Sequence, residues 1–371
     1  MAIPMRYAPR RGQFPYWLVA ATALAAVIAV IPIVGAIVAG LSGAGTPKTA
    51  FASAPAGNYA VAVRAEKEAD TVVVVPVSGK GDETAIATIP HISGYTSYGA
   101  VSPKGNLVAL VTTDSGTASR PIASLLMVEL ETARVRRIAS NVDYLQTPVW
   151  APDGSSVVVT RSTQSAAPKT DVTLVRVAAD ASGESQIGTA TDVLGAYPVG
   201  FDAQGRFVHV VVDGRGSTAY RDGAELARLA GGITRDWRLS PDGASLAFVE
   251  TSTAEGVKYF ARTVPLDGGV AAQAFAADAG QALGVAWQPG ASAPTFGQEP
   301  GGAGVASAQS VSSDGFDVPL GYAPDGKALA VQHWSGNTFA QPGNGELQVV
   351  GSDGARLKLE GFARFYGWAT R

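Results

Sequence analysis

The segment that decides the fold reads Ala151-Pro152-Asp153-Gly154-Ser155-Ser156-Val157-Val158-Val159-Thr160. Proline presets φ for the second position of a type I turn, aspartate suits the third, and glycine takes the left-handed position that closes a hairpin. The valine-rich run that follows is typical of a buried strand. This unit therefore predicts a tight turn that leads directly into a strand.

The same unit recurs along the whole chain, with a large aromatic residue ahead of several turns. The other copies occupy residues 102–105, 202–205, 240–243, 287–290 and 323–326. With Gly57 included, the turn glycines stand at 57, 105, 154, 205, 243, 290 and 326, at intervals of 48, 49, 51, 38, 47 and 36 residues. One four-stranded propeller blade takes ~40–50 residues. The repeat therefore predicts an all-β propeller rather than two or three separate domains.

The first and last repeats complement each other. Ala54-Pro55-Ala56-Gly57 leads into a strand at 59–63, but no strand precedes that turn. The missing strand is found at the C-terminus, where Phe365-Tyr366-Gly367-Trp368-Ala369 matches Thr147-Pro148-Val149-Trp150-Ala151. We expect this C-terminal strand to close the first blade, so that no sheet edge is left at the junction.

The expected propeller covers residues 54–371 and has seven blades. The weakest blade lies between Gly290 and Gly326, where 295–304 is rich in glycine and proline and only 305–311 resembles a strand. If that blade does not form, the count falls to six.

The N-terminal segment predicts a membrane anchor. Residues 17–41 carry no charge, and 25 helical residues span roughly 37 Å, enough for a hydrocarbon core of about 30 Å. Arg6, Arg10 and Arg11 precede this run, so the positive-inside rule places the N-terminus in the cytoplasm. We expect a cytoplasmic tail (1–15), a single transmembrane helix acting as signal anchor (16–41), a flexible linker (42–53) and an extracytoplasmic propeller. A signal peptide cleaved near 52–54 is the alternative, although its apolar region is normally about 7–15 residues.

Composition excludes several classes of function. The 371 residues have a formal net charge of −3 and only 16% charged side chains, without the basic surface of a nucleic-acid-binding protein. The absence of cysteine excludes disulfides and thiolate metal sites. The histidines, His91, His209 and His333, fall at different points of their repeats and match no metal-binding spacing. We therefore expect no metal, no cofactor and no catalytic residue that a motif would identify.

The recurrent Pro-Asp-Gly turn followed by an apolar strand resembles the TolB-type, WD40-like (PD40) propeller repeat. The resemblance covers residues 55–369, nearly everything after the apolar segment. It implies a propeller that acts as a partner-docking platform, an accessory domain of a peptidase or part of a larger receptor. A full TolB protein also carries an α/β domain ahead of its propeller, where this chain has the apolar segment.

Propellers commonly bind ligands at the mouth of the central channel, where the inner strand of each blade begins. Alignment of the turn glycines places Tyr95 and Tyr144 at equivalent positions, ten residues ahead of Gly105 and Gly154. Aromatic and arginine side chains are enriched at recognition surfaces. The candidate binding residues near these loops are Tyr95, Tyr98, Asp143, Tyr144, Gln146, Tyr197, Arg235, Asp236, Asp317, Arg364 and Tyr366.

Two functions follow from this reading. The favoured one is a membrane-anchored, non-catalytic scaffold that binds an envelope protein or an extracellular polymer. The alternative is a propeller enzyme, such as a hydrolase, lyase or quinone-dependent dehydrogenase, with its site at the central channel. An enzyme would need convergent acid, base or metal-binding groups, which the sequence does not cluster.

Overall fold

The computed structural model describes residues 48–78, 82–118, 120–166, 168–253, 257–274, 281–299, 315–336 and 338–371. They belong to one compact unit, Thr46–Arg371. The predicted tail (1–15), the predicted anchor (16–41) and most of the linker lie outside the described residues. Within the described ranges, no helix combines the length and the apolar character needed to cross a bilayer.

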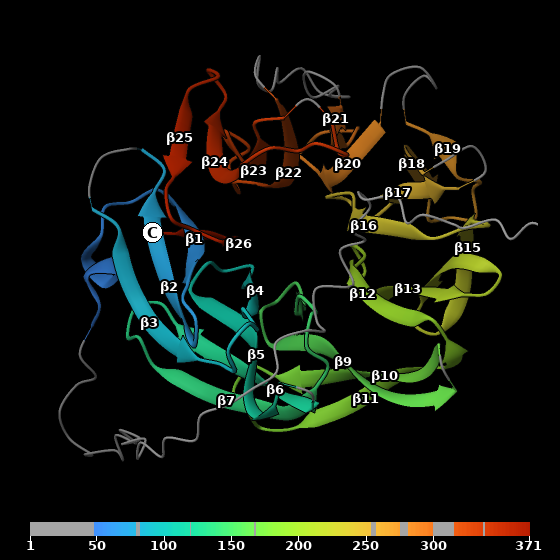
Figure 1. The fold of residues 1–371 in the computed structure, drawn as a ribbon, viewed down its shortest axis with the longest axis horizontal. Coiled ribbons are helices and arrows are strands. Elements are labelled where there is room, and N and C mark those ends of the chain that lie inside the picture. Colours follow the sequence, from blue (N-terminus) through green and yellow to red (C-terminus); the bar gives the residue numbers. More distant parts are fainter. Residues whose placement is uncertain are drawn as a thin grey trace, which may run out of the picture. The chain divides into compact units, whose positions relative to one another are not determined.

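Six four-stranded antiparallel sheets form the blades of an all-β propeller, with the inner strands around its centre (Figure 1). We number the blades along the chain and name the inner strand first. Blade 1 consists of β26 (Arg364–Thr370), β1 (Asn58–Ala65), β2 (Ala69–Pro76) and β3 (Thr84–Pro90). Blade 2 consists of β4 (Tyr98–Val101), β5 (Leu107–Thr117), β6 (Arg120–Glu129) and β7 (Val135–Val142). Blade 3 consists of β8 (Val149–Trp150), β9 (Ser156–Ala166), β10 (Lys169–Ala178) and β11 (Glu184–Val193).

The second half of the ring repeats this arrangement. Blade 4 consists of β12 (Gly195–Phe201), β13 (Phe207–Asp213), β14 (Gly216–Arg221) and β15 (Ala224–Ala230). Blade 5 consists of β16 (Thr234–Leu239), β17 (Ser245–Ser252), β18 (Lys258–Pro265) and β19 (Ala272–Gln273). Blade 6 consists of β22 (Phe316–Tyr322), β23 (Ala328–Trp334), β24 (Gly345–Gly351) and β25 (Arg356–Leu359).

The prediction of seven blades is wrong, and the count is six, as the alternative allowed. Between blades 5 and 6 the described residues form only a two-stranded sheet of β20 (Gln281–Ala286) and β21 (Thr295–Glu299). The sequence after β21 begins Pro300-Gly301-Gly302, and glycine and proline are poor strand formers. The strand expected at 305–311 lies outside the described residues.

Six of the seven predicted turn units are confirmed. The seventh is not, because Gly57 has φ of 153° and its backbone nitrogen donates to the carbonyl oxygen of Arg371 at 3.0 Å. The six turn glycines at 105, 154, 205, 243, 290 and 326 have φ between 66° and 76°, the left-handed conformation that a hairpin of this kind requires. At Gly105 the turn also packs against the end of the chain. A Cβ atom there would lie 2.7 Å from the backbone nitrogen of Thr370, so glycine is needed for space as well as for conformation.

The predicted closure of the ring is also confirmed. β26 pairs with β1 in antiparallel register, with Ala369 opposite Tyr59 and Trp368 opposite Ala60. The indole Nε1 of Trp368 donates to the carbonyl oxygen of Gly321 in blade 6 at 3.2 Å. The last strand therefore completes blade 1 and at the same time contacts blade 6.

A buried polar network fastens the closed blade to blade 2. One carboxylate oxygen of Asp70 accepts hydrogen bonds from both the backbone nitrogen and the Oγ of Ser97, each at 2.6 Å. Ser97 Oγ lies 2.7 Å from the hydroxyl of Tyr366 on β26, and the other Asp70 oxygen lies 3.3 Å from His91 Nε2. All four residues are buried. The network thus joins β2, the connection from β3 to β4, and β26.

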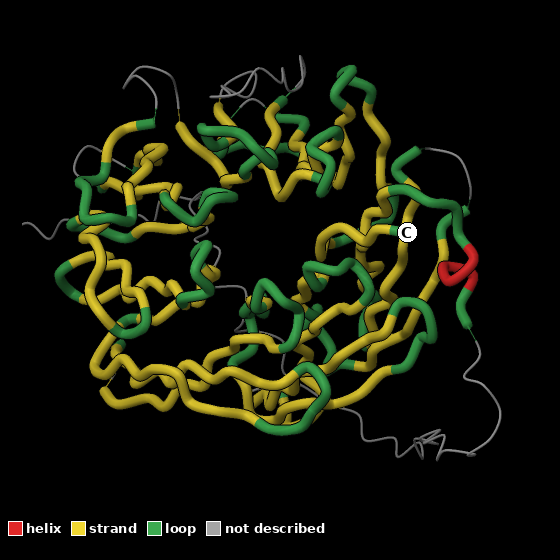
Figure 2. The backbone as a smooth tube through the Cα atoms, turned by 180° about the vertical axis from the view of Figure 1, so that it is seen from behind, coloured by secondary structure: helices red, strands yellow, loops and turns green. Residues whose placement is uncertain are grey.

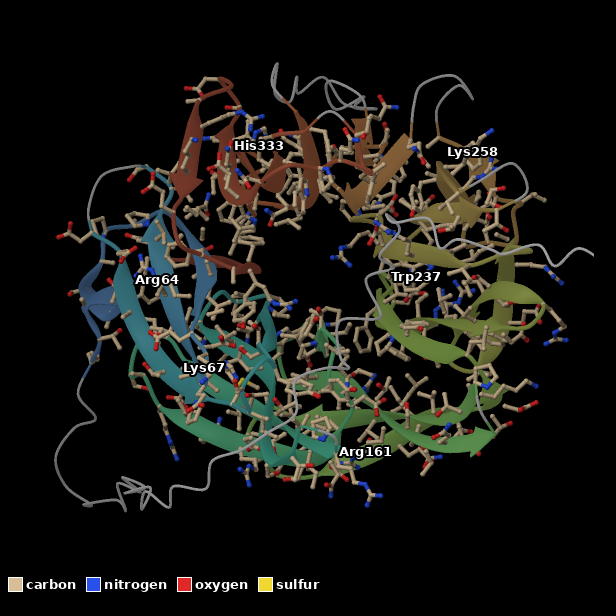
Figure 3. All side chains as sticks on the ribbon, in the orientation of Figure 1. Arg64, Lys67, Arg161, Trp237, Lys258 and His333 are labelled. Atoms are coloured by element: carbon tan, nitrogen blue, oxygen red, sulfur yellow. The ribbon has the colours of Figure 1, made fainter. Side chains whose placement is uncertain are left out.

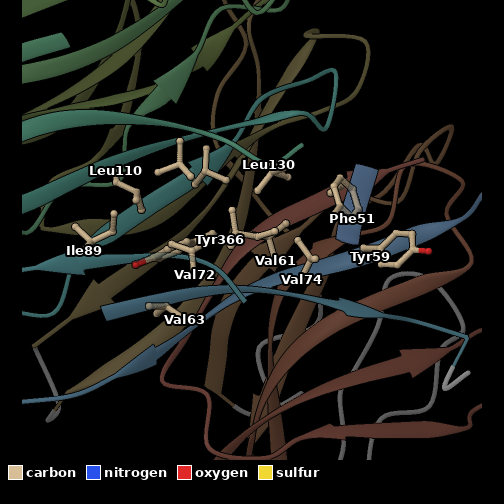
Figure 4. Packing of buried hydrophobic residues seen from close by; sticks show 14 of the residues in the cluster. Phe51, Tyr59, Val61, Val63, Val72, Val74, Ile89, Leu110, Leu130 and Tyr366 are labelled. Atoms are coloured by element: carbon tan, nitrogen blue, oxygen red, sulfur yellow. The ribbon is translucent and has the colours of Figure 1, made fainter. Parts of the chain in front are cut away.

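The compact unit begins before the propeller start expected at residue 54. A 3-10 helix, η1 (Ala50–Ser53), is the short red element in Figure 2. It buries Phe51, whose ring meets the edge of Tyr59 at a centroid distance of 5.2 Å (Figure 4). Thr49 donates from its backbone nitrogen to the Glu131 carbonyl oxygen at 2.7 Å. The end of the predicted linker is therefore held against blades 1 and 2.

Candidate binding site on the inner strands

A pocket of ≈ 600 Å³ opens where blades 3, 4 and 5 meet. Its wall comes from the loop before β8 (143–147), the start of β12 (194–198), residues 236–238 of β16 and the facing parts of β9 and β10. We call it the Tyr197 pocket. Its volume lies within the ~300–1,000 Å³ that is usual for ligand sites.

A bulge in β16 forms one side of this pocket. Arg235 pairs with Val249 and Arg238 with Ala247, so two residues, Asp236 and Trp237, stand opposite Phe248. Asp236 has φ of 58°, a left-handed conformation that aspartate tolerates better than most residues. Bulges of this kind redirect side chains and are frequent next to functional sites.

The redirected Trp237 stacks on Tyr197, with ring centroids 5.0 Å apart and an interplanar angle of 29° (Trp237 is labelled in Figure 3). Trp237 Nε1 donates to Thr234 Oγ1 at 2.8 Å, which fixes the indole. The Tyr197 ring lies over Gly195, where a Cβ atom would come within 2.5 Å of its hydroxyl. Burial raises the pKa of Tyr197, so the phenol stays neutral at physiological pH.

The loop 143–147 is tied to β9 by its polar side chains. The Asp143 carboxylate accepts from Thr160 Oγ1 at 2.6 Å, and from the backbone nitrogen and Oγ of Ser162 at 2.8 and 2.7 Å. Gln146 accepts from the Thr160 nitrogen at 2.7 Å and donates to the Asp143 carbonyl oxygen at 2.6 Å. These predicted site residues therefore use their polar groups to hold the loop in position.

The fixed loop presents Tyr144 and Leu145 to solvent, with exposed fractions of 40% and 62%. Leu145 has φ of 62°, an unfavourable conformation for a residue of this kind. Tyr144 meets the edge of Tyr95 from blade 2 at a centroid distance of 5.5 Å. The two tyrosines that the repeat alignment placed at equivalent positions are therefore in contact.

Apolar exposure is concentrated at this pocket. Nine large hydrophobic side chains are exposed among the described residues, and four of them line the Tyr197 pocket: Tyr144, Leu145, Leu194 and Tyr197. Exposed apolar residues that are scattered singly need no explanation, but a contiguous group marks an interaction site.

Charged groups lie at the β16 side of the pocket. Arg235 and Asp236 form an ion pair at 2.9 Å, and Asp236 also accepts from the Gly284 nitrogen at 3.3 Å. Arg238 reaches solvent, but the protein around it lowers the pKa of its guanidinium by desolvation, and the Asp236 carboxylate opposes this effect. Because an arginine cannot be deprotonated in a protein, Arg238 remains a cation.

The remaining predicted residues lie elsewhere. Arg364 stacks over the Tyr98 ring at 3.8 Å across blades 1 and 2, and Arg235 lies over the Tyr259 ring at 5.2 Å. Asp317 is buried and is engaged by His333 Nδ1 at 2.7 Å and Arg356 at 2.6 Å. Tyr366 is buried in the closure network, and burial raises its pKa. Neither Asp317 nor Tyr366 is free to meet a ligand.

Sequence reasoning missed most of the pocket wall, including the four residues on which a ligand contact would depend, Leu145, Leu194, Trp237 and Arg238. Trp237 and Arg238 follow directly after the predicted Arg235 and Asp236, and the same enrichment of aromatic and arginine residues could have included them. The two leucines carry no such signal in the sequence.

In the described ranges, no group of three or more acidic, histidine or cysteine side chains could hold a metal ion. Asp70, His91 and Ser97 are the residue types of a hydrolytic triad, but their order in space is different. The Asp70 carboxylate lies between Ser97 Oγ and His91 Nε2, so the histidine is not placed to accept the serine proton.

No protein-family model matches this sequence, and no curated protein matches it. Solved structures resemble it in fold. TolB from Acinetobacter baumannii has a TM-score of 0.51 at 15% identity, covering 84% of this chain and 66% of TolB. The dihydro-heme d1 dehydrogenase NirN has a TM-score of 0.51 at 16% identity, covering 85% of this chain and 75% of NirN. A puromycin hydrolase mutant has a TM-score of 0.53 at 18% identity, covering 84% of this chain and 53% of the hydrolase. These likenesses concern the fold alone, a β-propeller like that of TolB.

Proposed function

We propose that this chain is a non-catalytic binding scaffold that holds a segment of a partner protein in the Tyr197 pocket. The observation that carries the proposal is the concentration of exposed apolar side chains, four of nine in the described residues, around one pocket of ≈ 600 Å³. Exposed Leu145 and Leu194 suit the apolar side chains of a protein better than the hydroxyl-rich surface of an extracellular polymer.

Binding is favoured over catalysis because the carboxylates of the pocket are already engaged. Asp143 accepts three hydrogen bonds from β9, and Asp236 is paired with Arg235. A general acid or base must be able to reach a proton on the substrate. Two carboxylates that are engaged by hydrogen bonds and an ion pair within the protein do not meet that requirement.

The proposed cellular location of the propeller rests on the N-terminal sequence. A transmembrane helix at 16–41 would tether the propeller outside the cell membrane, and the partner would then be a protein of the cell envelope. The repeat would be of the WD40-like, TolB type.

Site-specific photocrosslinking in cells tests the proposal. A photoreactive phenylalanine analogue replaces Leu145, and the control carries it at Val135, which is also exposed (41%, against 62% for Leu145) but lies on the outer strand β7. We expect a discrete protein adduct from position 145 that is absent from position 135 and is lost when Tyr197→Ser is added. Identical adducts at both positions would refute the site, and a polysaccharide adduct at 145 alone would replace a protein by a polymer as the ligand.

A further inference from the structure

Arg238 is a solvent-exposed cation on the wall of the Tyr197 pocket, beside the exposed apolar side chains and apart from the two engaged carboxylates, Asp143 and Asp236. Its Nη1 donates only to the carbonyl oxygen of Trp237, at 3.0 Å, and within the described part of the chain its guanidinium has no carboxylate partner. The nearest candidate on its own strand, Asp236, is already paired with Arg235 at 2.9 Å. A guanidinium offers five donors in a rigid fork, and most of them are unused here.

The inner strands are positively charged, although the chain as a whole is negative. In the described residues they carry five charged side chains: Arg235, Asp236, Arg238, Asp317 and Arg364. Arg235 and Asp236 neutralise each other, and Asp317 is buried against Arg356 on the outer strand of blade 6. Among the described residues, Arg238 and Arg364 remain without an acidic partner, whereas the formal net charge of the chain is −3.

We infer that the ligand of the Tyr197 pocket is an acidic peptide segment, in which a carboxylate side chain stands next to apolar residues. The carboxylate pairs with Arg238, and the apolar residues contact Tyr197, Leu194 and Leu145. This inference rests on the proposed binding function and specifies its ligand. The basic tail at residues 1–15 has the wrong charge to occupy this pocket in a second copy of the chain.

The arrangement explains why the cation is held at this place. Arg238 follows directly after the bulge that positions Trp237 against Tyr197. The same bend in β16 therefore places both the tryptophan ring and the guanidinium. A charge-assisted hydrogen bond next to an apolar surface gives a ligand both affinity and a defined orientation. It also gives specificity, because a ligand with a neutral amide in place of the carboxylate would bind Arg238 more weakly.

Selection from a phage-displayed library of random dodecapeptides on the immobilised full-length protein tests this inference. We expect enriched peptides to combine Asp or Glu with Leu, Ile, Phe or Tyr. Replacing the acid of a selected peptide by its amide should weaken binding to the wild-type protein by about 10- to 100-fold. The same replacement should change binding to Arg238→Gln by less than about threefold. Arg238→Lys should retain the preference for acid, since it keeps the charge.

The control variant is Arg134→Gln, which removes the same charge from an exposed turn between β6 and β7 and should leave the preference for acid unchanged. If enriched peptides carry no acid, or if the acid preference persists in Arg238→Gln, the inference is overturned. The proposed function still stands in that case, provided that Leu145→Ser abolishes peptide binding. If no peptide depends on Leu145 or Tyr197, the proposed function fails as well.

Discussion

Leu145 is held in a conformation that lowers the stability of the protein, and a matched pair of substitutions measures this effect. Its φ is 62° and its side chain is 62% exposed, whereas Leu194, on the same pocket, is 39% exposed and is not among the residues with positive φ. Leu145→Gly and Leu194→Gly remove the same side chain from two different backbone conformations.

The expected difference follows from three contributions. Glycine adopts the left-handed conformation without the steric clash of a Cβ atom, which relieves roughly 1–2 kcal/mol at position 145 and nothing at position 194. Introducing glycine costs roughly 0.5–1 kcal/mol at either position through the entropy of the unfolded chain. Full burial of a leucine contributes ~1.5–3 kcal/mol, of which the mostly exposed Leu145 loses about a third and Leu194 well over half. Leu145→Gly should therefore be close to neutral, whereas Leu194→Gly should cost about 2 kcal/mol.

Urea unfolding of the full-length protein, followed by tryptophan fluorescence, gives the two changes in free energy of unfolding. The comparison is internal, so it does not depend on the absolute stability. If Leu145→Gly proves as destabilising as Leu194→Gly, the backbone at position 145 is not strained, and its φ gives no reason to assign this leucine a role in binding. If Leu145→Gly leaves the free energy of unfolding unchanged but abolishes peptide binding, the leucine serves binding and contributes nothing to stability.

Three further predictions concern the network, the ring stack and a buried histidine. Asp70→Asn should lower the free energy of unfolding by about 3 kcal/mol, because it weakens the charge-assisted bonds from Ser97, and urea unfolding measures the loss. Gly195→Ala should displace the Tyr197 ring and abolish peptide binding with little change in melting temperature, which titration of a selected peptide and a thermal melt check together. Burial lowers the pKa of His209 from 6.5 to about 4, so only the unfolded chain takes up this proton in that window. The free energy of unfolding should therefore fall as the pH decreases from 6.5 to 4, by about 3 kcal/mol, and His209→Phe should remove that part of the slope.

The fold was predictable because its signals are local. A Pro-Asp-Gly turn specifies backbone conformation within four residues, and a repeat of such turns specifies blades. The closure of the ring was predictable because the strand at 365–369 has the same pattern as 147–151. The number of blades was not, because regular spacing of turns does not show whether a glycine- and proline-rich stretch can supply the remaining strands.

The site was only partly predictable because it depends on backbone conformations that the residue types in the sequence do not indicate. The sequence predicted Tyr95, Tyr144 and Tyr197 for the mouth of the channel, since aromatic residues in entry loops are a compositional signal. Tyr144 and Tyr197 line the pocket, and Tyr95 contacts Tyr144. The residue types gave no reason to expect Leu145 in the left-handed region. That conformation is imposed by the hydrogen bonds of Asp143 and Gln146 to β9, which exist only after blade 3 has formed.

The pocket depends on a structural feature that several inner strands share, a register irregularity against the next strand, and on the residues that β16 places at it. The inner strands β12, β20, β22 and β26 each show a register irregularity against the next strand, as β16 does. In β20 the left-handed position of the irregularity is Gly284, with φ of 62°, whereas in β16 it is Asp236, with φ of 58°. The repeat therefore supplies the bend. In the part of the chain that the structure describes, only β16 combines this bend with an aspartate that pairs with Arg235, a tryptophan that stacks on Tyr197, and an arginine that has no carboxylate partner. Because the bend also occurs in blades 1, 4 and 6, where it carries neither a tryptophan nor an arginine, it belongs to the ring, and the residues placed on it in β16 are free to serve a ligand.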